Sequence, residues 1–255
     1  MKKLVVFIGL CILSSGWFVF NISAQNPPSS FVVFEEFVEP ADVAAFTAVQ
    51  QQAVDLWKKH SFEVPILSYG TEDYTFYWVI PIENFGSIDG IFQKSSAISK
   101  KMKEEDGFDG DKAFRELSTI RSSVIMWSPE LSYHPDGYNG QTPDKPYCEW
   151  SFCSLKQGHE KEAAEALKKW IEFYKTSGEK YDWDVFHVVF GHDTPMLILM
   201  TRSKDPLTIR QQEAVLWEKH SKEFGELWKE FATHIRKIEN KTGWYKPEWS
   251  IIRAQ

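Results

Sequence analysis

The sequence lacks most features that hold a small fold together or do chemistry by themselves. Only 3 of its 255 residues are cysteine, which excludes a framework of disulfide bonds. It contains no Gly-rich phosphate loop, no G-x-S-x-G nucleophile elbow and no Cys-x-x-Cys pair. His159 and Glu160 begin a zinc-protease pattern, but Ala163 stands where the second histidine is required. The acidic stretch 106–111 has Phe108 at a ligand position of a calcium loop. We therefore predict neither a metal site nor a cofactor.

An excess of positive charge is also absent. The sequence has 29 Lys and Arg against 36 Asp and Glu, which gives a net charge of −7. Acidic and basic residues are interleaved, as at 103–105 and 160–162, so cations do not cluster as a nucleic-acid surface requires. We therefore expect no nucleic-acid partner. The 43% of hydrophobic and 25% of charged residues are typical of a globular protein.

The N-terminus has the order of an export signal. Lys2 and Lys3 precede an apolar run, and small residues follow at 22–24. This order predicts a signal peptide over residues 1–24, and hence export to the periplasm or out of the cell. The alternative is an uncleaved anchor, because residues 4–22 could nearly span a bilayer, although serine, glycine and asparagine within them disfavour it. No later run is long and apolar enough to cross a membrane, so we expect no membrane contact after the signal is removed.

Two cysteines remain in the exported chain. Cys148 and Cys153 lie five residues apart in the strand-like stretch 147–155. An odd separation in a strand places the two side chains on opposite faces, about 16 Å apart at roughly 3.3 Å per residue. They cannot bridge each other, and we predict two unpaired, buried thiols that serve packing rather than catalysis.

The rest of the chain is predicted to be two similar halves, a first repeat over 25–134 and a second over 147–255, joined by a linker at 135–146 that is rich in proline and glycine. Each half reads strand, helix, strand, strand, helix, strand. The expected strands are 31–37, 63–69, 74–80, 128–133, 147–155, 183–190, 196–201 and 248–252, and the expected helical regions are 40–59, 86–121, 159–176 and 206–239. The two closing strands share letters, Pro129-Glu130-Leu131-Ser132 against Pro247-Glu248-Trp249-Ser250.

Two tandem β-α-β-β-α-β units of about 100 residues each resemble the dimeric α/β-barrel superfamily, in which two ferredoxin-like sheets face each other. The resemblance implies an α+β fold in which one chain supplies both ferredoxin-like units, packed as a pseudo-dimeric barrel. It also implies pockets between each sheet and its helices, and between the two sheets. Members of the superfamily include cofactor-free monooxygenases, isomerases and haem-binding proteins, so the fold does not choose one activity.

Aromatic side chains are the candidates for holding a ligand. The expected strand 74–80 carries Phe76 and Trp78 on one face and Tyr77 on the other, which suits a sheet covered on both sides. Such rings are usually core, but together they make an apolar cavity with a few polar tips plausible. We predict Tyr77, Trp78, Trp150 and Glu149 as ligand-binding residues.

Titratable residues on apolar faces are the candidates for catalysis. His60 continues the apolar stripe of its helix, and His187 lies mid-strand between valines, so both should point inward. Glu35 and Glu36 are adjacent in the first strand, so one must face each side of the sheet; a buried one has to be paired, hydrogen-bonded or protonated. His187, His60 and Glu35 are our candidate catalytic residues. A histidine on an apolar face is, however, more often a hydrogen-bonded core residue.

Three hypotheses for the function follow. The favoured one is an exported protein that binds a small apolar or aromatic molecule in a cavity between sheet and helices. The first alternative is an enzyme of the cofactor-free oxygenase or isomerase type, in which an inward histidine acts as a base. The second alternative is haem binding through one histidine. Because one chain supplies both sheets, we expect a monomer or a homodimer.

Overall fold

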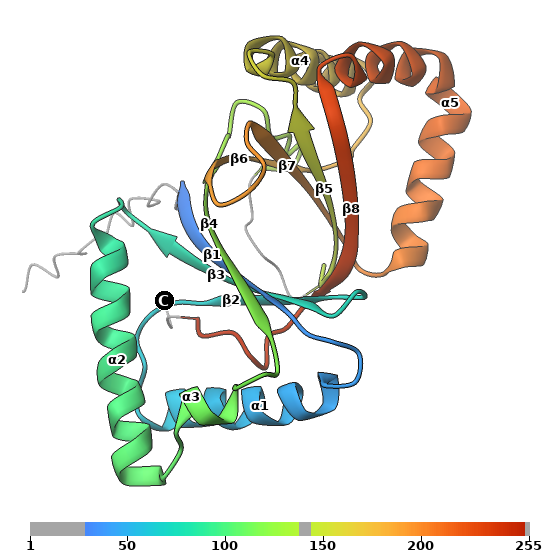
Figure 1. Cartoon of the computed structure of the whole chain (residues 1–255). Coiled ribbons are helices and arrows are strands. Elements are labelled where there is room, and N and C mark those ends of the chain that lie inside the picture. Colours follow the sequence, from blue (N-terminus) through green and yellow to red (C-terminus); the bar gives the residue numbers. More distant parts are fainter. Residues whose placement is uncertain (1–28, 138–143, 253–255) are drawn as a thin grey trace, which may run out of the picture.

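One chain builds a closed β-barrel with helices on its outside (Figure 1). The computed structural model describes residues 29–137 and 144–252. The predicted signal peptide over residues 1–24 and part of the predicted linker lie outside these residues. The described elements, in chain order, are β1 (Ser30–Phe37), α1 (Val43–Lys59), β2 (Leu67–Thr71), β3 (Thr75–Ile82), α2 (Ser87–Asp106), α3 (Gly110–Ala113), β4 (Thr119–Trp127), β5 (Tyr147–Leu155), α4 (Glu160–Ser177), β6 (Asp184–Phe190), β7 (Met196–Ser203), α5 (Pro206–Ala232) and β8 (Ile235–Tyr245).

The strand order repeats itself in the two halves. Around the barrel it is β1-β3-β2-β8-β5-β7-β6-β4, and all neighbouring strands are antiparallel. The first half contributes β4-β1-β3-β2 and the second half β8-β5-β7-β6, which is the same order of first, second, third and closing strand. The two four-stranded sheets join at the β2–β8 and β4–β6 edges, so one chain closes the barrel. The predicted α+β barrel is confirmed.

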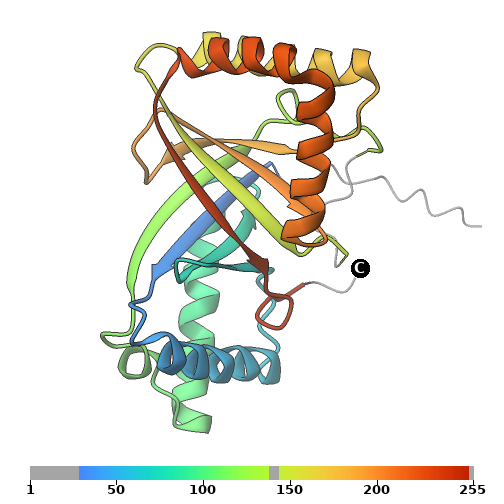
Figure 2. The same cartoon turned by 90° about the vertical axis from the view of Figure 1, so that its right-hand side faces the viewer.

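Helices cover the outer face of each sheet. In both views α1 and α3 lie on one side of the barrel, and α4 lies on the opposite side (Figures 1 and 2). Helix α5 begins at a standard cap, because the Asp205 carboxylate accepts a 2.7 Å hydrogen bond from the Thr208 amide and Pro206 occupies the first turn. It then bends at His220, whose φ of −131° is not helical. After the bend its last turns run beside α4.

Alternation along the strands divides the core into three layers. Tyr77, Trp150 and Cys148 belong to the core inside the barrel. Phe76 and Trp78 face the helices of the first half, as the alternation of that strand predicts. Cys153 faces the helices of the second half. Both cysteines are free and buried, so the prediction of two unpaired, buried thiols on opposite faces is confirmed, and burial raises the pKa of each thiol to about 12.

The closing strands lie elsewhere than predicted. The sequence predicts them at 128–133 and 248–252, but they are β4 and β8, and the expected helical regions 86–121 and 206–239 end correspondingly earlier. The reason is that the inner faces of β4 and β8 carry polar residues such as Arg121 and Lys241, so these strands lack the apolar alternation that marks a half-buried strand.

The matched Pro-Glu-x-Ser segments instead follow each closing strand and return to the helix side of the sheet. Tyr133 then forms an isolated bridge with Trp183, just before β6, and Ile251 forms one with Ile66, just before β2. The shared letters therefore do occupy equivalent places in the two halves, although outside the barrel.

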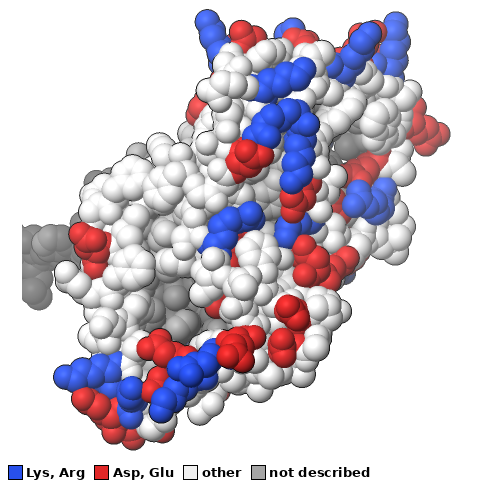
Figure 3. Space-filling view, in the orientation of Figure 1, with Lys and Arg blue, Asp and Glu red and all other residues white. Residues whose placement is uncertain are grey.

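Charged side chains of both signs are interspersed on the face of the molecule seen in Figure 3. Within residues 29–137 and 144–252, no helix is long and apolar enough to cross a membrane.

Candidate functional site

A buried ion cluster lies at the end of the barrel where β1 finishes and β4 begins. Glu35 points into the barrel and its side chain is 1% exposed. Arg121, its neighbour across the strand pair, donates from Nε to Oε1 at 3.2 Å and from Nη2 to Oε2 at 2.6 Å. His192, in the hairpin between β6 and β7, places Nε2 2.6 Å from Oε1 of the same carboxylate. Glu35 therefore links two strands of the first half to a hairpin of the second.

A glycine allows the hairpin to reach the cluster. Gly191 has a φ of +100°, which favours glycine, and a Cβ there would lie 2.2 Å from the backbone oxygen of Ser122. The hairpin can therefore press directly against β4. The imidazole of His192 stacks on Phe152 with ring centroids 5.8 Å apart. Sequence reasoning missed His192 because it lies in a polar turn, and the preceding glycine is the only local signal.

The two adjacent glutamates have opposite pKa shifts. Burial is the largest influence on Glu35 and would raise its pKa, but hydrogen bonds and positive charge from His192 and Arg121 outweigh it, so the pKa is lowered. Glu36 faces the helices and meets only neutral donors, Trp78 Nε1 at 2.8 Å and Ser118 Oγ at 3.4 Å. Burial therefore raises the pKa of Glu36. Both sides of β1 are covered, and each carboxylate is partnered, as the sequence requires.

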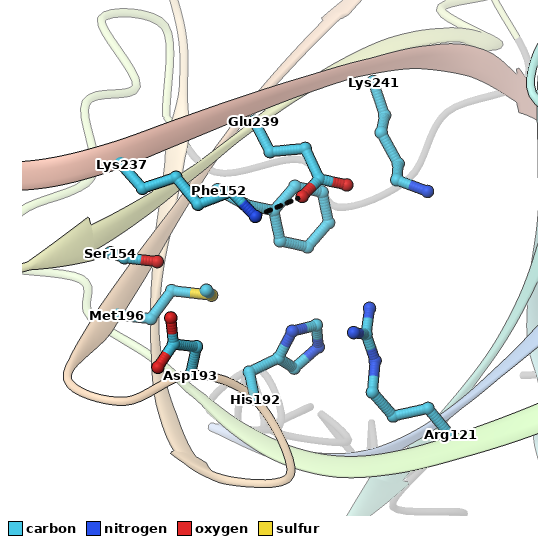
Figure 4. A pocket seen from close by; sticks show the side chains of 9 residues that line it. All are labelled: Arg121, Phe152, Ser154, His192, Asp193, Met196, Lys237, Glu239 and Lys241. Carbon is cyan, nitrogen blue, oxygen red and sulfur yellow. Dashed lines mark hydrogen bonds and ion pairs between the residues drawn. The ribbon is translucent and has the colours of Figure 1, made fainter.

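The ion cluster borders a pocket, here called the barrel-end pocket, with about 400 Å³ of space outside the atoms. Its lining residues are Arg121, Phe152, Ser154, His192, Asp193, Met196, Lys237, Glu239 and Lys241. The side chains of Arg121, His192 and Lys241 point toward the same space, with Phe152 behind it (Figure 4). Lys241 is held by Asp73, at 2.8 Å from Nζ to Oδ2, and by Thr75 Oγ1 at 3.0 Å.

Three buried hydroxyls inside the barrel have no hydrogen-bond partner in the described part of the chain. They are Tyr77 Oη, Ser123 Oγ and Tyr245 Oη. Tyr77 is 8% exposed, and its ring stacks on Trp150 with centroids 6.0 Å apart. Burial raises the pKa of Tyr77, and the nearby carboxylates of Glu35 and Asp73 raise it further. Tyr77 is the cross-strand neighbour of Glu35, and its side chain belongs to the core inside the barrel.

A second pocket lies between the outer face of the second sheet and its helices, in the angle of the bent α5. This sheet–helix pocket has about 800 Å³ of space outside the atoms. Its walls are mostly aromatic and aliphatic. The lining residues are Glu149, Ser151, Leu167, Trp170, Tyr174, Tyr181, Trp183, Leu199, Thr201, Glu213, Trp228 and Phe231.

One edge of the sheet–helix pocket is polar. Arg210 bridges its two carboxylates, with Nη2 2.7 Å from Glu149 Oε1 and Nη1 2.5 Å from Glu213 Oε2. Tyr147 and Tyr181 donate to the same two residues, each at 3.0 Å. The described partners of Glu149 all meet Oε1, which leaves Oε2 as an acceptor at the pocket edge.

The predicted ligand-binding residues lie in three places. Tyr77 and Trp150 are inside the barrel, not between sheet and helices as expected. Trp78 packs under the first-half helices, where its indole binds Glu36. Glu149 lines the sheet–helix pocket. The structure therefore does not bring these four residues together, because the alternation of β3 and β5 sends neighbouring residues to opposite faces.

The predicted histidines do not join Glu35. His187 shares the outer face of β6 with Val185, which packs under the second-half helices, whereas Phe186 and Val188 point into the barrel. Burial lowers the pKa of His187. His60 ends α1 and lies 2.5 Å from Asp106 in the helical layer of the first half. The inward histidine of the barrel is His192. Over the described ranges, no group of three His, Cys, Asp or Glu side chains could hold a metal ion.

Comparison with known proteins finds likeness in structure only. No protein-family model and no curated protein sequence matches the chain. An anthrone oxidase-like protein superposes with a TM-score of 0.61 and 11% identity, covering 87% of this chain and 92% of the other. A candidate monooxygenase from Fusobacterium nucleatum subsp. nucleatum gives 0.52 and 14%, covering 87% and 94%. A variant of chlorite dismutase from Candidatus Nitrospira defluvii gives 0.51 and 15%, also covering 87% and 94%.

Identities this low show the fold alone. Together with the closed antiparallel barrel and its outer helices, they show that the chain has the fold of the dimeric α/β-barrel superfamily. The resemblance predicted from the order of elements is confirmed at this level.

Proposed function

We propose that this protein is an exported α/β barrel that binds a small apolar or aromatic molecule in the sheet–helix pocket. The observation that carries the proposal is the pocket itself, with mostly aromatic and aliphatic walls and polar groups at one edge. Ligand sites commonly show this division between an apolar wall and a few polar groups. We also infer that the two halves are tandem ferredoxin-like units, because their strands follow the same order.

The polar edge suggests how a ligand is oriented. Arg210 and the two tyrosine hydroxyls hold the carboxylates of Glu149 and Glu213 in place, so these groups need not reorganise when a ligand enters. A hydroxyl or amine of the ligand donates to Glu149 Oε2, while its rings pack against Trp170 and Tyr174. The ligand class is therefore an aromatic molecule that carries at least one hydrogen-bond donor.

The two alternatives receive less support at this pocket. Its described lining contains no histidine, cysteine or methionine, so the residues present do not fit a haem held through an axial histidine. His187 and His220 lie on the helix side of the second half without lining this pocket, and His192 lies on the other side of the sheet. The candidate monooxygenase and anthrone oxidase-like neighbours share the fold, and the pocket of this chain favours binding without chemistry.

Occupation of the pocket is testable with a substitution that fills it. Ser151 lies on the pocket floor, where its hydroxyl bonds Asn240 at 2.8 Å. We expect N-phenyl-1-naphthylamine to bind the purified protein with enhanced fluorescence. Ser151→Trp should weaken this binding by roughly tenfold or more by occupying the space, whereas Ser151→Ala should not. Circular dichroism checks that both variants are folded. Equal binding by the folded Trp variant and the wild type, or no binding by either, would contradict the proposal.

Export is tested separately. Mass spectrometry of the protein from its native host should find a mature chain that begins near Gln25 in the periplasmic or extracellular fraction. An intact N-terminal Met1 in the cytosolic fraction would overturn this part of the proposal. The same preparation should be extracted with organic solvent, because a copurified aromatic compound would identify the ligand. Size-exclusion chromatography would distinguish the predicted monomer from the homodimer.

A further inference from the structure

The sheet–helix pocket carries an excess of negative charge at its polar edge. The charged residues of its described lining are Glu149 and Glu213, and this lining includes no lysine, arginine or histidine. Arg210 bridges the two carboxylates from outside the lining, and its side chain is 57% exposed. On the two helices that bound the pocket, Lys169 and Glu230 pair with each other at 2.6 Å and do not change the balance. Because a single guanidinium balances only one of two carboxylates, the edge keeps a net negative charge.

This negative charge acts on the walls of the pocket. Tyr174 and Tyr181 both line it. Burial is the largest influence on the pKa of each tyrosine and raises it, and the charge of Glu213 raises both pKa values further. A neighbouring carboxylate has this effect because it disfavours the negatively charged phenolate. The same charge therefore attracts a cationic ligand and repels an anionic one.

The aromatic walls favour a positive charge in the same place. Four of the lining rings belong to Trp170, Tyr174, Tyr181 and Trp183. The ring centroid of Tyr174 lies 5.2 Å from that of Trp183 and 6.0 Å from that of Tyr181, so these rings form one cluster. The face of an aromatic ring attracts a cation through its quadrupole, and the attraction is stronger where water is displaced. Carboxylates beside such rings are a combination suited to an organic cation.

Glu149 indicates which kind of cation fits. Its described hydrogen bonds, from Arg210 Nη2 and Tyr147 Oη, both go to Oε1, so Oε2 is left to accept a donor of the ligand. An ammonium group that carries N–H bonds supplies such a donor, whereas a quaternary ammonium does not. Resting on the function proposed for this pocket, we propose that its ligand is a protonated arylalkylamine, whose ammonium group donates to Glu149 Oε2 and whose ring packs against Trp170 and Tyr174.

Calorimetric titration with three matched probes tests the charge of the ligand. At neutral pH 2-phenylethylamine is a cation, 2-phenylethanol is its neutral analogue and 3-phenylpropionate is an anion. We expect the amine to bind roughly tenfold more tightly than the alcohol, because a charge-assisted hydrogen bond is stronger than a neutral one, and the anion to bind most weakly. Ser151→Trp, which fills the pocket, should weaken binding of the amine by roughly tenfold or more.

Substitution of either carboxylate by its amide tests the source of the preference. Glu149→Gln and Glu213→Gln each remove one negative charge and keep a side chain of similar shape. Each should lower the ratio of amine affinity to alcohol affinity several-fold, and one folded variant is enough if the other does not fold. Glu165→Gln is the matched control, since it makes the same change at an exposed position of α4 whose carboxylate pairs with Lys168, and it should leave the ratio unchanged.

The outcomes separate this inference from the proposed function. Binding of the neutral N-phenyl-1-naphthylamine together with equal affinities for amine and alcohol would overturn the inference alone. It would also be overturned if 3-phenylpropionate bound as tightly as the amine, if the ratio stayed unchanged in the folded glutamine variants of Glu149 and Glu213, or if folded Ser151→Trp bound the amine like the wild type. Absence of N-phenyl-1-naphthylamine binding would overturn the proposed function, and the inference with it.

Discussion

Two adjacent residues in β1 show how the groups packed against each face of a strand determine the protonation state of a carboxyl side chain. Glu35 and Glu36 have the same chemistry, and both are at least 90% buried. Glu35 faces an arginine and a histidine inside the barrel, whereas Glu36 faces an indole and a hydroxyl under the helices. The first environment favours the carboxylate and the second favours the neutral acid.

This difference predicts opposite effects of pH on stability. The pKa of Glu35 is lowered from 4.5, so its contribution is present above pH 4.5 and is lost as the pH falls toward the folded pKa. Glu35→Gln should lower the free energy of unfolding by about 2 kcal/mol at neutral pH, because the buried His192 and the partly exposed Arg121 lose a charged hydrogen-bond partner, and should flatten the acid limb of the stability curve. The pKa of Glu36 is raised from 4.5, so its contribution is complete below pH 4.5 and is lost as the pH rises through the folded pKa. Glu36→Gln should therefore stabilise the protein at neutral pH.

Urea unfolding of the wild type and both variants across the acid range measures these effects. Each glutamine variant serves as the control for the other, since the two positions are adjacent and the substitution is identical. A loss of stability in both variants at neutral pH, with parallel pH curves, would contradict the assignment of the two environments.

At the scale of elements, strands with apolar alternation could be predicted from the sequence, whereas strands with polar inner faces could not. The alternation in β3 and β5 fixes which face each aromatic ring and each cysteine takes, and the structure agrees. The closing strands β4 and β8 were misplaced, because their inner faces line a polar pocket and therefore lack apolar alternation.

The candidate site could be predicted only in part for the same reason. Glu35 stands out in the sequence as a charge within an apolar strand, and Glu149 stands out similarly. His192 has no such context, because a histidine in a polar hairpin turn normally meets water, and only the closure of the barrel brings it onto Glu35. Long-range partners of this kind depend on tertiary packing, which local sequence patterns do not contain.

At the scale of the whole molecule, the two halves are joined at both ends of the barrel by buried or partly buried polar contacts. At one end His192 of the second half meets Glu35 of the first, and Lys241 meets Asp73. At the other end Asp184 of the second half accepts a 2.9 Å hydrogen bond from Trp127 Nε1 of the first. These contacts, together with the shared apolar core, lead us to expect that the halves unfold as one cooperative unit.

The seam between β2 and β8, where the two sheets pair, is the part of the barrel closure most sensitive to a small substitution. Three residue pairs form the seam, and Gly243 lies so close to β2 that a Cβ on it would be 2.3 Å from the backbone oxygen of Gly70. Any side chain must therefore push the two sheets apart. We expect Gly243→Ala to lower the free energy of unfolding by at least about 2 kcal/mol, because backbone atoms cannot give way as a flexible side chain can.

Gly90→Ala in α2 is the matched control for this substitution. Its Cβ would meet nothing within 4 Å, so the same chemical change should stabilise the protein by about 0.5–1 kcal/mol through helix propensity. Urea unfolding followed by tryptophan fluorescence reports on both halves at once, because each half contains buried indoles, among them Trp78 and Trp183. If closure of the barrel couples the halves, Gly243→Ala shifts the entire transition to lower urea, and an unchanged midpoint would mean that this seam contributes nothing to holding the barrel closed.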